Sequence, residues 1–361
     1  MRPPSHATRQ QSQLRWAFWN AGWTRWTILA TAIAGFVLFA WLLRRVGYGE
    51  VGAGFRSLGW GFAVVFALGG LRFAVRAMAW VRCVEPPERL GFGDAFAAFL
   101  AGDTLNTLTP AGMLASEPTK ALVVADRLSA GAAAASIAIE NILYSLSVGL
   151  MITSGALVFL HSADVSTSGR RAILATVAAC LLTSVALAVV MTTRRRPLTR
   201  LLSHVAARPD RGSRLVRWTT HIATFEGRVV GFAGRESRRW WTVLGLETSY
   251  HVAAVFEVWL TLVWILPVDA RPTLVQAVVL ESMNRLVTVL FKVVPLRVGI
   301  DEAAAGVAAD ALELTSATGV TLALIRKARI LCWTVAGLAM MSGRELLVRR
   351  SSRLRGRATS S

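Results

Sequence analysis

The amino-acid sequence predicts an all-α, polytopic membrane protein with about six spanning helices and two re-entrant hairpins that enter from opposite faces. Three observations predict this class. Hydrophobic residues make up 54% of the 361 residues and charged residues only 17%, a more apolar balance than soluble domains have. The apolar residues come in blocks of about 20, the length that crosses a hydrocarbon core. Two further semi-apolar regions are interrupted by charges, prolines and glycines.

Six apolar blocks have the length and composition of spanning helices. They are residues 27–43, 59–81, 143–160, 172–191, 241–266 and 321–341. A signal peptide is the alternative for the first block, because basic residues precede it. Arg44 and Arg45 follow this block directly, and the segment before it carries tryptophans at spacings of three and four, as interfacial helices do. We therefore expect a first span here.

The formal net charge of +19 is spread over the membrane flanks. Most arginines lie in a leader at residues 1–26, a connector at 194–240 and a tail at 346–361. Such an excess marks the cytoplasmic side, so both termini and the connector are predicted to be cytoplasmic, and the membrane domain spans residues 27–345. The connector and the tail are expected to contact anionic lipid, and no nucleic-acid partner is expected.

Cysteine and histidine do not show the pattern of a metal site. Cys83, Cys180 and Cys332 are odd in number and widely separated, and the five histidines are scattered without a ligand spacing. No metal and no cofactor are expected.

Two semi-apolar regions, 92–126 and 274–312, are neither plain spans nor plain loops. Because both termini lie on one side, the number of spans is even, and each region begins and ends on one side of the membrane. The first lies between a span that returns to the cytoplasm and one that leaves it, and the second lies between the last two spans. Two hairpins entering from opposite faces are typical of inverted-repeat carriers.

The first region combines interruptions of a helix with polar residues. The interruptions are Pro110, Gly112 and Pro118, and the polar residues are Asn106, Glu117 and Lys120. Glu117 and Lys120 can pair if a helix starts near Pro118, because proline is favoured in a first helical turn. The free amides of that helix start, together with Lys120, suit an anionic headgroup. A cytoplasmic loop with a surface ion pair is the alternative, and it stays open.

The second region has two breaks and a high density of charge. The breaks are Pro295 and Gly299, and the charged residues are Glu281, Arg285, Lys292, Arg297, Asp301 and Glu302. Asp301 and Glu302 open an alanine-rich helix, where the helix dipole alone favours acids. So many charges in an apolar stretch are costly in lipid, and they usually face a cavity or a partner. Glu281 and Arg285 lie one helical turn apart and are expected to neutralise each other.

Glu257 is the best single candidate for a buried acid. It lies about ten residues from the nearest strongly polar flank of its span, so its carboxylate cannot easily reach water. Arg72 and Arg76 share a face of the second span, Glu140 precedes the third, and the sixth contains Arg326 and Lys327.

The two interrupted regions resemble the flippase-like transmembrane family typified by the membrane domain of bacterial lysylphosphatidylglycerol synthases. The residues that carry the resemblance are Asn106, Pro110, Gly112, Glu117, Pro118 and Lys120, then Pro295, Gly299, Asp301 and Glu302. It covers most of residues 27–345 and implies translocation of a lipid or lipid-linked substrate in a bacterial cytoplasmic membrane. Met113, Leu114, Ala115 and Arg297 stand where glycine is common in the family, so the substrate is not carried over. Only a short basic tail follows Met341, and the chain is not expected to make lysylphosphatidylglycerol by itself.

The favoured function is a carrier of an anionic lipid and not an enzyme. Lys120, Arg285 and Lys292 would attract a phosphate-bearing headgroup, and the acids of the same regions would pair with these cations or with a cationic part of the substrate. A membrane-embedded lipid-modifying enzyme is an alternative, but the loop at residues 44–58 has Glu50 as its one acid. A non-transporting scaffold for envelope-lipid synthesis, such as that of hopanoids, is another. The oligomeric state is not predicted.

Overall fold

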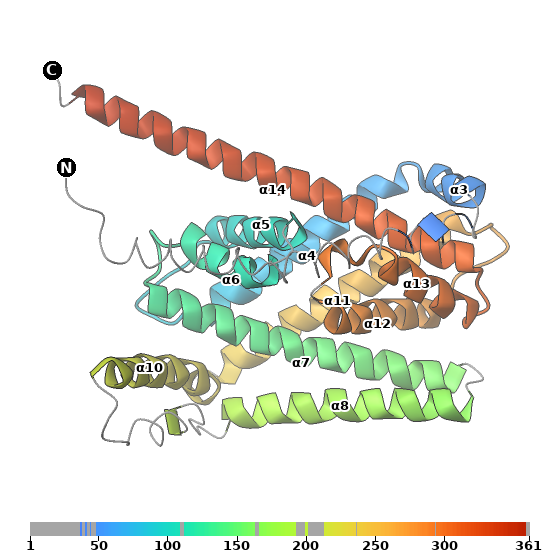
Figure 1. The fold of residues 1–361 in the computed structure, drawn as a ribbon, viewed down its shortest axis with the longest axis horizontal. Coiled ribbons are helices and arrows are strands. Elements are labelled where there is room, and N and C mark those ends of the chain that lie inside the picture. Colours follow the sequence, from blue (N-terminus) through green and yellow to red (C-terminus); the bar gives the residue numbers. More distant parts are fainter. Residues whose placement is uncertain are drawn as a thin grey trace.

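The computed structural model describes residues 37, 40, 41, 44, 48–108, 112–162, 166–192, 199–200, 213–235, 237–292 and 294–358. Every regular element in this part of the chain is a helix (Figure 1), which confirms the predicted all-α class. The predicted leader, most of the first predicted span and the break at Pro110 lie outside the described residues.

The helices follow one another in a simple order. They are α3 (Tyr48–Leu58), α4 (Gly61–Cys83), α5 (Phe92–Leu108), α6 (Gly112–Val123), α7 (Ala130–Ser162), α8 (Thr167–Thr192), α10 (Ser213–Arg235), α11 (Ser237–Ile265), α12 (Leu274–Leu290), the 3-10 turn η1 (Pro295–Arg297), α13 (Ile300–Asp310) and α14 (Ser316–Ala358). In Figure 1, α7 and α8 run side by side along the length of the molecule, and α14 extends along its upper edge.

Four described helices are long and apolar enough to cross a membrane. They lie at Gly61–Cys83, Ala130–Ser162, Thr167–Val189 and Arg238–Ile265, and they contain or largely overlap the predicted spans 59–81, 143–160, 172–191 and 241–266. The chain is therefore a polytopic membrane protein. The sixth predicted span, 321–341, lies inside α14, which carries Arg326, Lys327 and Arg329 within that stretch.

The second of the four spanning helices, α7, starts earlier than the apolar block at 143–160 indicates. α7 begins at Ala130 because its alanine-rich first half is buried, with Ala133 and Ala135 in the main apolar cluster beside residues of α4, α5 and α11. Alanine is the best helix former and leaves room for close packing. Most side chains of the next helix, α8, are exposed on the surface of the protein, as those of a lipid-facing helix are expected to be.

The first interrupted region is a helical hairpin formed by α5 and α6, which pack against each other. A Cβ at Gly112 would lie 2.4 Å from the backbone of Asn106, so only glycine allows the start of α6 to approach α5 this closely. Pro118 lies inside α6 and not at a helix start, so the expected break at Pro118 is wrong. The helix begins six residues earlier because Gly112 permits the turn.

The second interrupted region is also a helical hairpin, formed by α12 and α13. Thr273 caps α12 by a capping box with Gln276. The break runs through η1, which begins at Pro295, to Gly299, which precedes α13 with φ of 83°. This left-handed conformation favours glycine. The predicted breaks at Pro295 and Gly299 are confirmed.

Each hairpin has an open end, where the chain enters and leaves it, and a closed end, where its two helices are joined. The open ends of the two hairpins lie at opposite ends of α7. At the start of α7, Ser129 donates from its backbone N and its hydroxyl to Glu88, which precedes α5. Beyond its end, His161 and Ser162 line a cavity together with Gln276 and Leu312 of the second hairpin. The closed ends face inward, where α5 contacts η1. Charged residues of the spans gather around this central region.

Candidate functional site

A buried ion network joins α4, α11 and α14 at Glu257. Glu257 is 2% exposed. One carboxylate oxygen accepts a hydrogen bond from Arg72 Nη1 at 2.9 Å, and the other lies 2.9 Å from Arg329 Nε. A single acid thus holds two arginines from helices that are far apart in the sequence. The structure places Glu257 in a network and not beside a free surface.

Glu281 of α12 bridges two further arginines in the same way. It accepts from Arg285 Nε at 2.6 Å and from Arg326 Nη2 at 2.8 Å. Arg285 also donates to the hydroxyl groups of Tyr144 and Tyr250, at 3.4 and 3.3 Å. The expected pairing of Glu281 with Arg285 forms, but Arg326 of α14 adds a second cation to the same carboxylate.

The charges of this cluster do not balance. We call Arg72, Arg285, Arg326, Arg329, Glu257 and Glu281 the arginine cluster; it has four cations and two carboxylates. Its arginine side chains are no more than 10% exposed. Asp103 of α5 interacts electrostatically with Arg329, and even an ionised Asp103 would leave one positive charge in excess. Buried surplus charge is unfavourable unless an opposite charge joins it, so the arginine cluster is suited to an anion.

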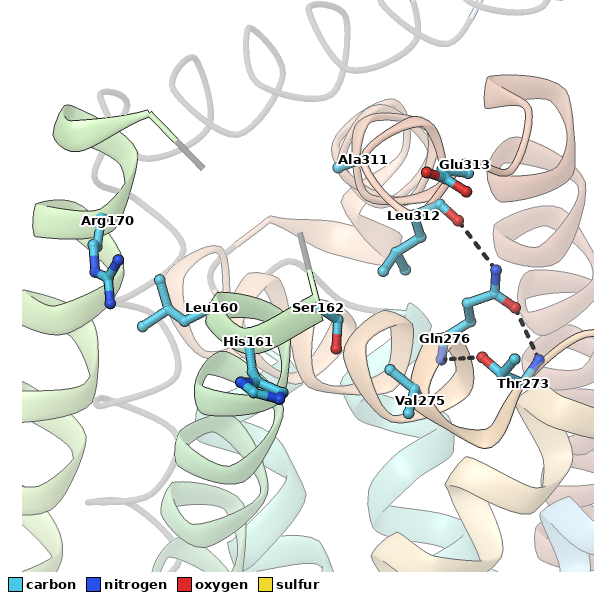
Figure 2. A pocket seen from close by; sticks show the side chains of 10 residues that line it. All are labelled: Leu160, His161, Ser162, Arg170, Thr273, Val275, Gln276, Ala311, Leu312 and Glu313. Atoms are coloured by element: carbon cyan, nitrogen blue, oxygen red, sulfur yellow. Dashed lines mark hydrogen bonds between the residues drawn. The ribbon is translucent and has the colours of Figure 1, made fainter. Parts of the chain in front are cut away.

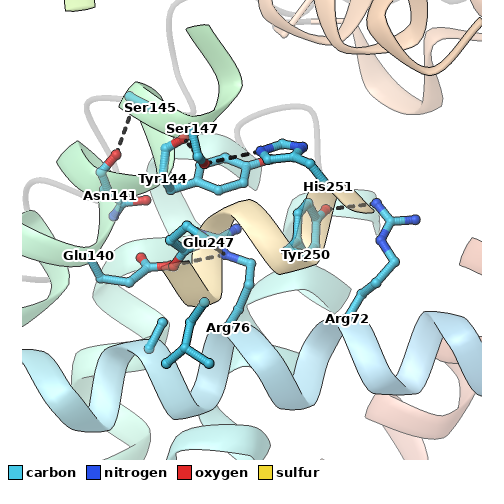
Figure 3. A network of polar contacts seen from close by, with 12 residues as sticks. Arg72, Arg76, Glu140, Asn141, Tyr144, Ser145, Ser147, Glu247, Tyr250 and His251 are labelled. Atoms are coloured by element: carbon cyan, nitrogen blue, oxygen red, sulfur yellow. Dashed lines mark hydrogen bonds and ion pairs between the residues drawn. The ribbon is translucent and has the colours of Figure 1, made fainter. Parts of the chain in front are cut away.

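An aromatic layer connects the arginine cluster to a second set of charges. Figure 3 shows side chains from α4, α7 and α11 converging here. Tyr144 and Tyr250 pack edge to face with ring centroids 5.7 Å apart, and the guanidinium groups of Arg76 and Arg72 lie over these rings at 3.8 and 4.5 Å. Cation–π contacts of this kind strengthen when they are desolvated. His251 is held by Ser147, with Nε2 and the hydroxyl 3.1 Å apart.

The closed end of the second hairpin is fixed to α14 by Lys327. Its ammonium group lies 2.5 Å from Glu302 and 3.9 Å from Asp301, and it donates to the backbone oxygen of Arg297 at 3.3 Å. Arg297 in turn pairs with Asp301 at 2.9 Å, and Glu302 accepts from the backbone N of Gly299 at 2.8 Å. Glu302 therefore caps α13, and both acids also bind Lys327 of α14.

The first hairpin carries a separate ion pair. Lys120 donates to Glu117 at 3.1 Å and lies 4.2 Å from the centre of the Phe99 ring. Lys120 is buried, whereas Glu117 is more than one-third exposed, so the pair is neither a plain surface bridge nor part of the arginine cluster. Asn106 and Lys292 are exposed near the breaks of the two hairpins. The structure does not bring these two residues into the network.

Several charged residues of the network were not among the predicted site residues. They are Arg72, Arg76, Glu140, Glu247, Arg326, Lys327 and Arg329. Most of these residues could have been found from the sequence, because they are ionisable residues at helical spacing inside apolar spans. Glu247 and Tyr250 could not, since they lie near the polar start of α11, where such residues are ordinary.

An open cavity of about 690 Å³ lies at the far end of α7, apart from the network (Figure 2). Its polar lining includes His161, Arg170, Gln276 and Glu313. Gln276 donates to the backbone oxygen of Leu312 at 3.1 Å and so joins the two helices of the second hairpin. In the described ranges, no three His, Cys, Asp or Glu side chains are grouped so that they could hold a metal ion.

Comparison with known proteins gives one match. The model of a family described as the lysylphosphatidylglycerol synthase TM region matches residues 27–338. No curated protein and no solved structure matches the chain. The match covers both hairpins and all the residues of the ion network.

Proposed function

Because the chain belongs to the lysylphosphatidylglycerol synthase transmembrane-region family, we propose that it is a carrier that moves an anionic lipid between the leaflets of a membrane. Family membership and the spanning helices establish a membrane protein with a lipid-related function. The observation that supports a carrier of anions is the surplus of positive charge in the arginine cluster. A phosphate or phosphodiester headgroup supplies the missing negative charge, and its oxygens accept the paired hydrogen bonds that guanidinium groups donate.

The burial of the arginine cluster indicates how such a carrier works. A headgroup reaches the four arginines when the closed ends of the hairpins separate from the helices around them. Lys120 in the first hairpin and Lys292 at the break of the second would attract the headgroup from the two sides. The proposal contains no enzymatic step, and it gives Glu257, Glu281 and Glu302 the role of holding cations.

We place the protein in a bacterial cytoplasmic membrane with both termini cytoplasmic. The support is the arginine excess of the two ends and of the connector. Helix α10 lies in this connector and is strongly amphipathic, so the connector is suited to lie against anionic lipid.

The opposed-hairpin topology predicts a specific labelling pattern. Asp126 and Asp310 are exposed at the open ends of the first and second hairpins. In a cysteine-free background, a membrane-impermeant maleimide added to intact cells should label Asp310→Cys but not Asp126→Cys. Permeabilised cells should label both. Labelling of both positions from the same side would contradict re-entrant hairpins that enter from opposite faces.

A liposome assay tests the carrier directly. Purified protein in phosphatidylcholine vesicles should move fluorescent phosphatidylglycerol to the inner leaflet, which dithionite quenching measures as a protected fraction. Fluorescent phosphatidylcholine, whose headgroup has no net charge, should move more slowly, because it does not supply the negative charge that the arginine cluster lacks. Equal rates for the two lipids, or no movement of either, would contradict the proposal.

A further inference from the structure

Next to the arginine cluster lies a pair of buried acids that share one cation. Glu140 of α7 is 1% exposed and Glu247 of α11 is not exposed. Arg76 Nη2 lies 2.5 Å from Glu140 Oε1, and Arg76 Nε lies 3.8 Å from Glu247 Oε2. We call Glu140 and Glu247 the acid pair. Two ionised carboxylates and one guanidinium would leave a net negative charge in the interior.

The hydrogen bonds of the acid pair are incomplete. Neither oxygen of Glu247 has a hydrogen-bond partner among the described residues, and Glu140 Oε2 has none either. Ionised carboxylates only accept hydrogen bonds, so they cannot bond to each other. Both carboxylates lie around the same guanidinium group of Arg76, so a proton on one carboxyl group can be donated to the other. One proton therefore removes the surplus negative charge and allows one hydrogen bond between the two carboxyl groups, which satisfies two of the three orphaned oxygens.

The other charged and titratable groups around the acid pair do not replace this proton. Those that face it are Arg76 and Cys83 of α4, Lys120 of α6, Tyr144 of α7, and Tyr250 and His251 of α11. Lys120 is bound to Glu117 at 3.1 Å. Asp103 of α5 interacts electrostatically with both Arg76 and Lys120, so these two cations already face acids beyond the acid pair.

Tyr144 connects the acid pair to the arginine cluster. Its ring lies 3.8 Å from the guanidinium of Arg76, and its hydroxyl accepts from Arg285. A negative headgroup bound at Arg285 would favour a proton on the acid pair, and the proton would favour the headgroup by the same factor, because coupling between two binding sites is reciprocal.

We propose that Glu140 and Glu247 together bind one proton, and that this proton crosses the membrane with the anionic headgroup. The second half of this inference rests on the proposed carrier function. A proton and a singly charged anionic lipid cross with no net charge, so a pH gradient drives the exchange and an electrical potential does not. Lipid would accumulate in the leaflet that faces the more alkaline compartment.

The proton itself can be tested without transport. Infrared spectra of the purified protein in lipid nanodiscs at neutral pH should contain the carbonyl band of a protonated buried carboxyl group. Glu247→Gln should lose this band, and because glutamine mimics the neutral acid, the variant should fold. Glu226→Gln is the control, since Glu226 is buried on α10 and accepts from Thr199; it should keep the band. A wild-type spectrum without the band, or a band that persists in both Glu247→Gln and Glu140→Gln, would overturn the proton site.

The coupling is tested in vesicles with an imposed pH gradient. At one proton per lipid, a gradient of one pH unit should shift the ratio of fluorescent phosphatidylglycerol between leaflets by about tenfold. Glu247→Gln should move the lipid but not respond to the gradient, and Glu226→Gln should respond as the wild type does. If the wild type transports lipid but does not respond to the pH gradient, the proposed coupling is wrong and the proposed carrier function still stands. No lipid movement by the wild type would refute the carrier, and the infrared band would still decide the proton site.

Discussion

Replacing Glu257 by leucine is expected to destabilise the protein by about 3–5 kcal/mol, the usual cost of removing one partner of a buried ion pair. Arg72 would keep its hydrogen bond to Tyr250 at 2.9 Å, but Arg329 would lose its acid. Both side chains would remain buried with uncompensated charge. Unfolding of the purified protein in mixed detergent micelles, followed by circular dichroism, measures the loss.

The matched control for this experiment is an exposed ion pair. Arg127 and Asp94 lie 3.2 Å apart, and the Arg127 side chain is 62% exposed. Arg127→Leu should cost no more than about 1 kcal/mol, because water and salt screen such pairs. Replacing Glu257, Arg72 and Arg329 together by apolar residues should recover much of the stability lost in Glu257→Leu. Equal costs for Glu257→Leu and Arg127→Leu would show that the bridge at Glu257 does not stabilise the fold.

Replacing Arg285 by glutamine is expected to slow the transport of anionic lipid by about 10-fold to 100-fold, the equivalent of one charged hydrogen bond of roughly 1.5–3 kcal/mol. The change removes one of the four positive charges of the arginine cluster. The fold should persist, because Glu281 keeps its bond to Arg326 at 2.8 Å. The initial rate of phosphatidylglycerol movement in vesicles is the measurement.

Two further variants sharpen the test at Arg285. Arg285→Lys keeps the charge but loses the paired donors, so its rate should fall between those of the wild type and Arg285→Gln. Arg82→Gln removes an exposed arginine at the end of α4 and should transport at the wild-type rate. If Arg285→Gln also transports at that rate, the arginine cluster does not bind the headgroup.

Local rules predicted the breaks of the hairpins unevenly. Pro295 and Gly299 interrupt the second hairpin as expected, because proline and positive φ act on a single residue and its neighbours. Pro118 was expected to start a helix, yet it lies inside α6. The start of α6 depends instead on how closely Gly112 approaches Asn106, which is a contact between two helices and is not visible in the residues around Pro118.

The sequence by itself determined the membrane class, the positions of four spans and the two interrupted regions. These features follow from the length of apolar blocks and from local helix breakers, both of which act over about 20 residues or fewer. It also determined pairs one turn apart, such as Glu281 with Arg285 and Glu117 with Lys120, since helix geometry fixes those neighbours.

Only the tertiary structure decided which charges share a site. Arg72 meets Glu257 across 185 residues, and Arg76 meets Glu140 across 64. Such pairings depend on which faces of distant helices pack together, and hydropathy reports that a charge lies in a span without giving its partner. Five helices together contribute Glu257 and Glu281 with the arginines around them, and Glu140 and Glu247 with the one arginine between them. The charge balance that suits this interior to an anion and a proton therefore exists only once the chain is folded.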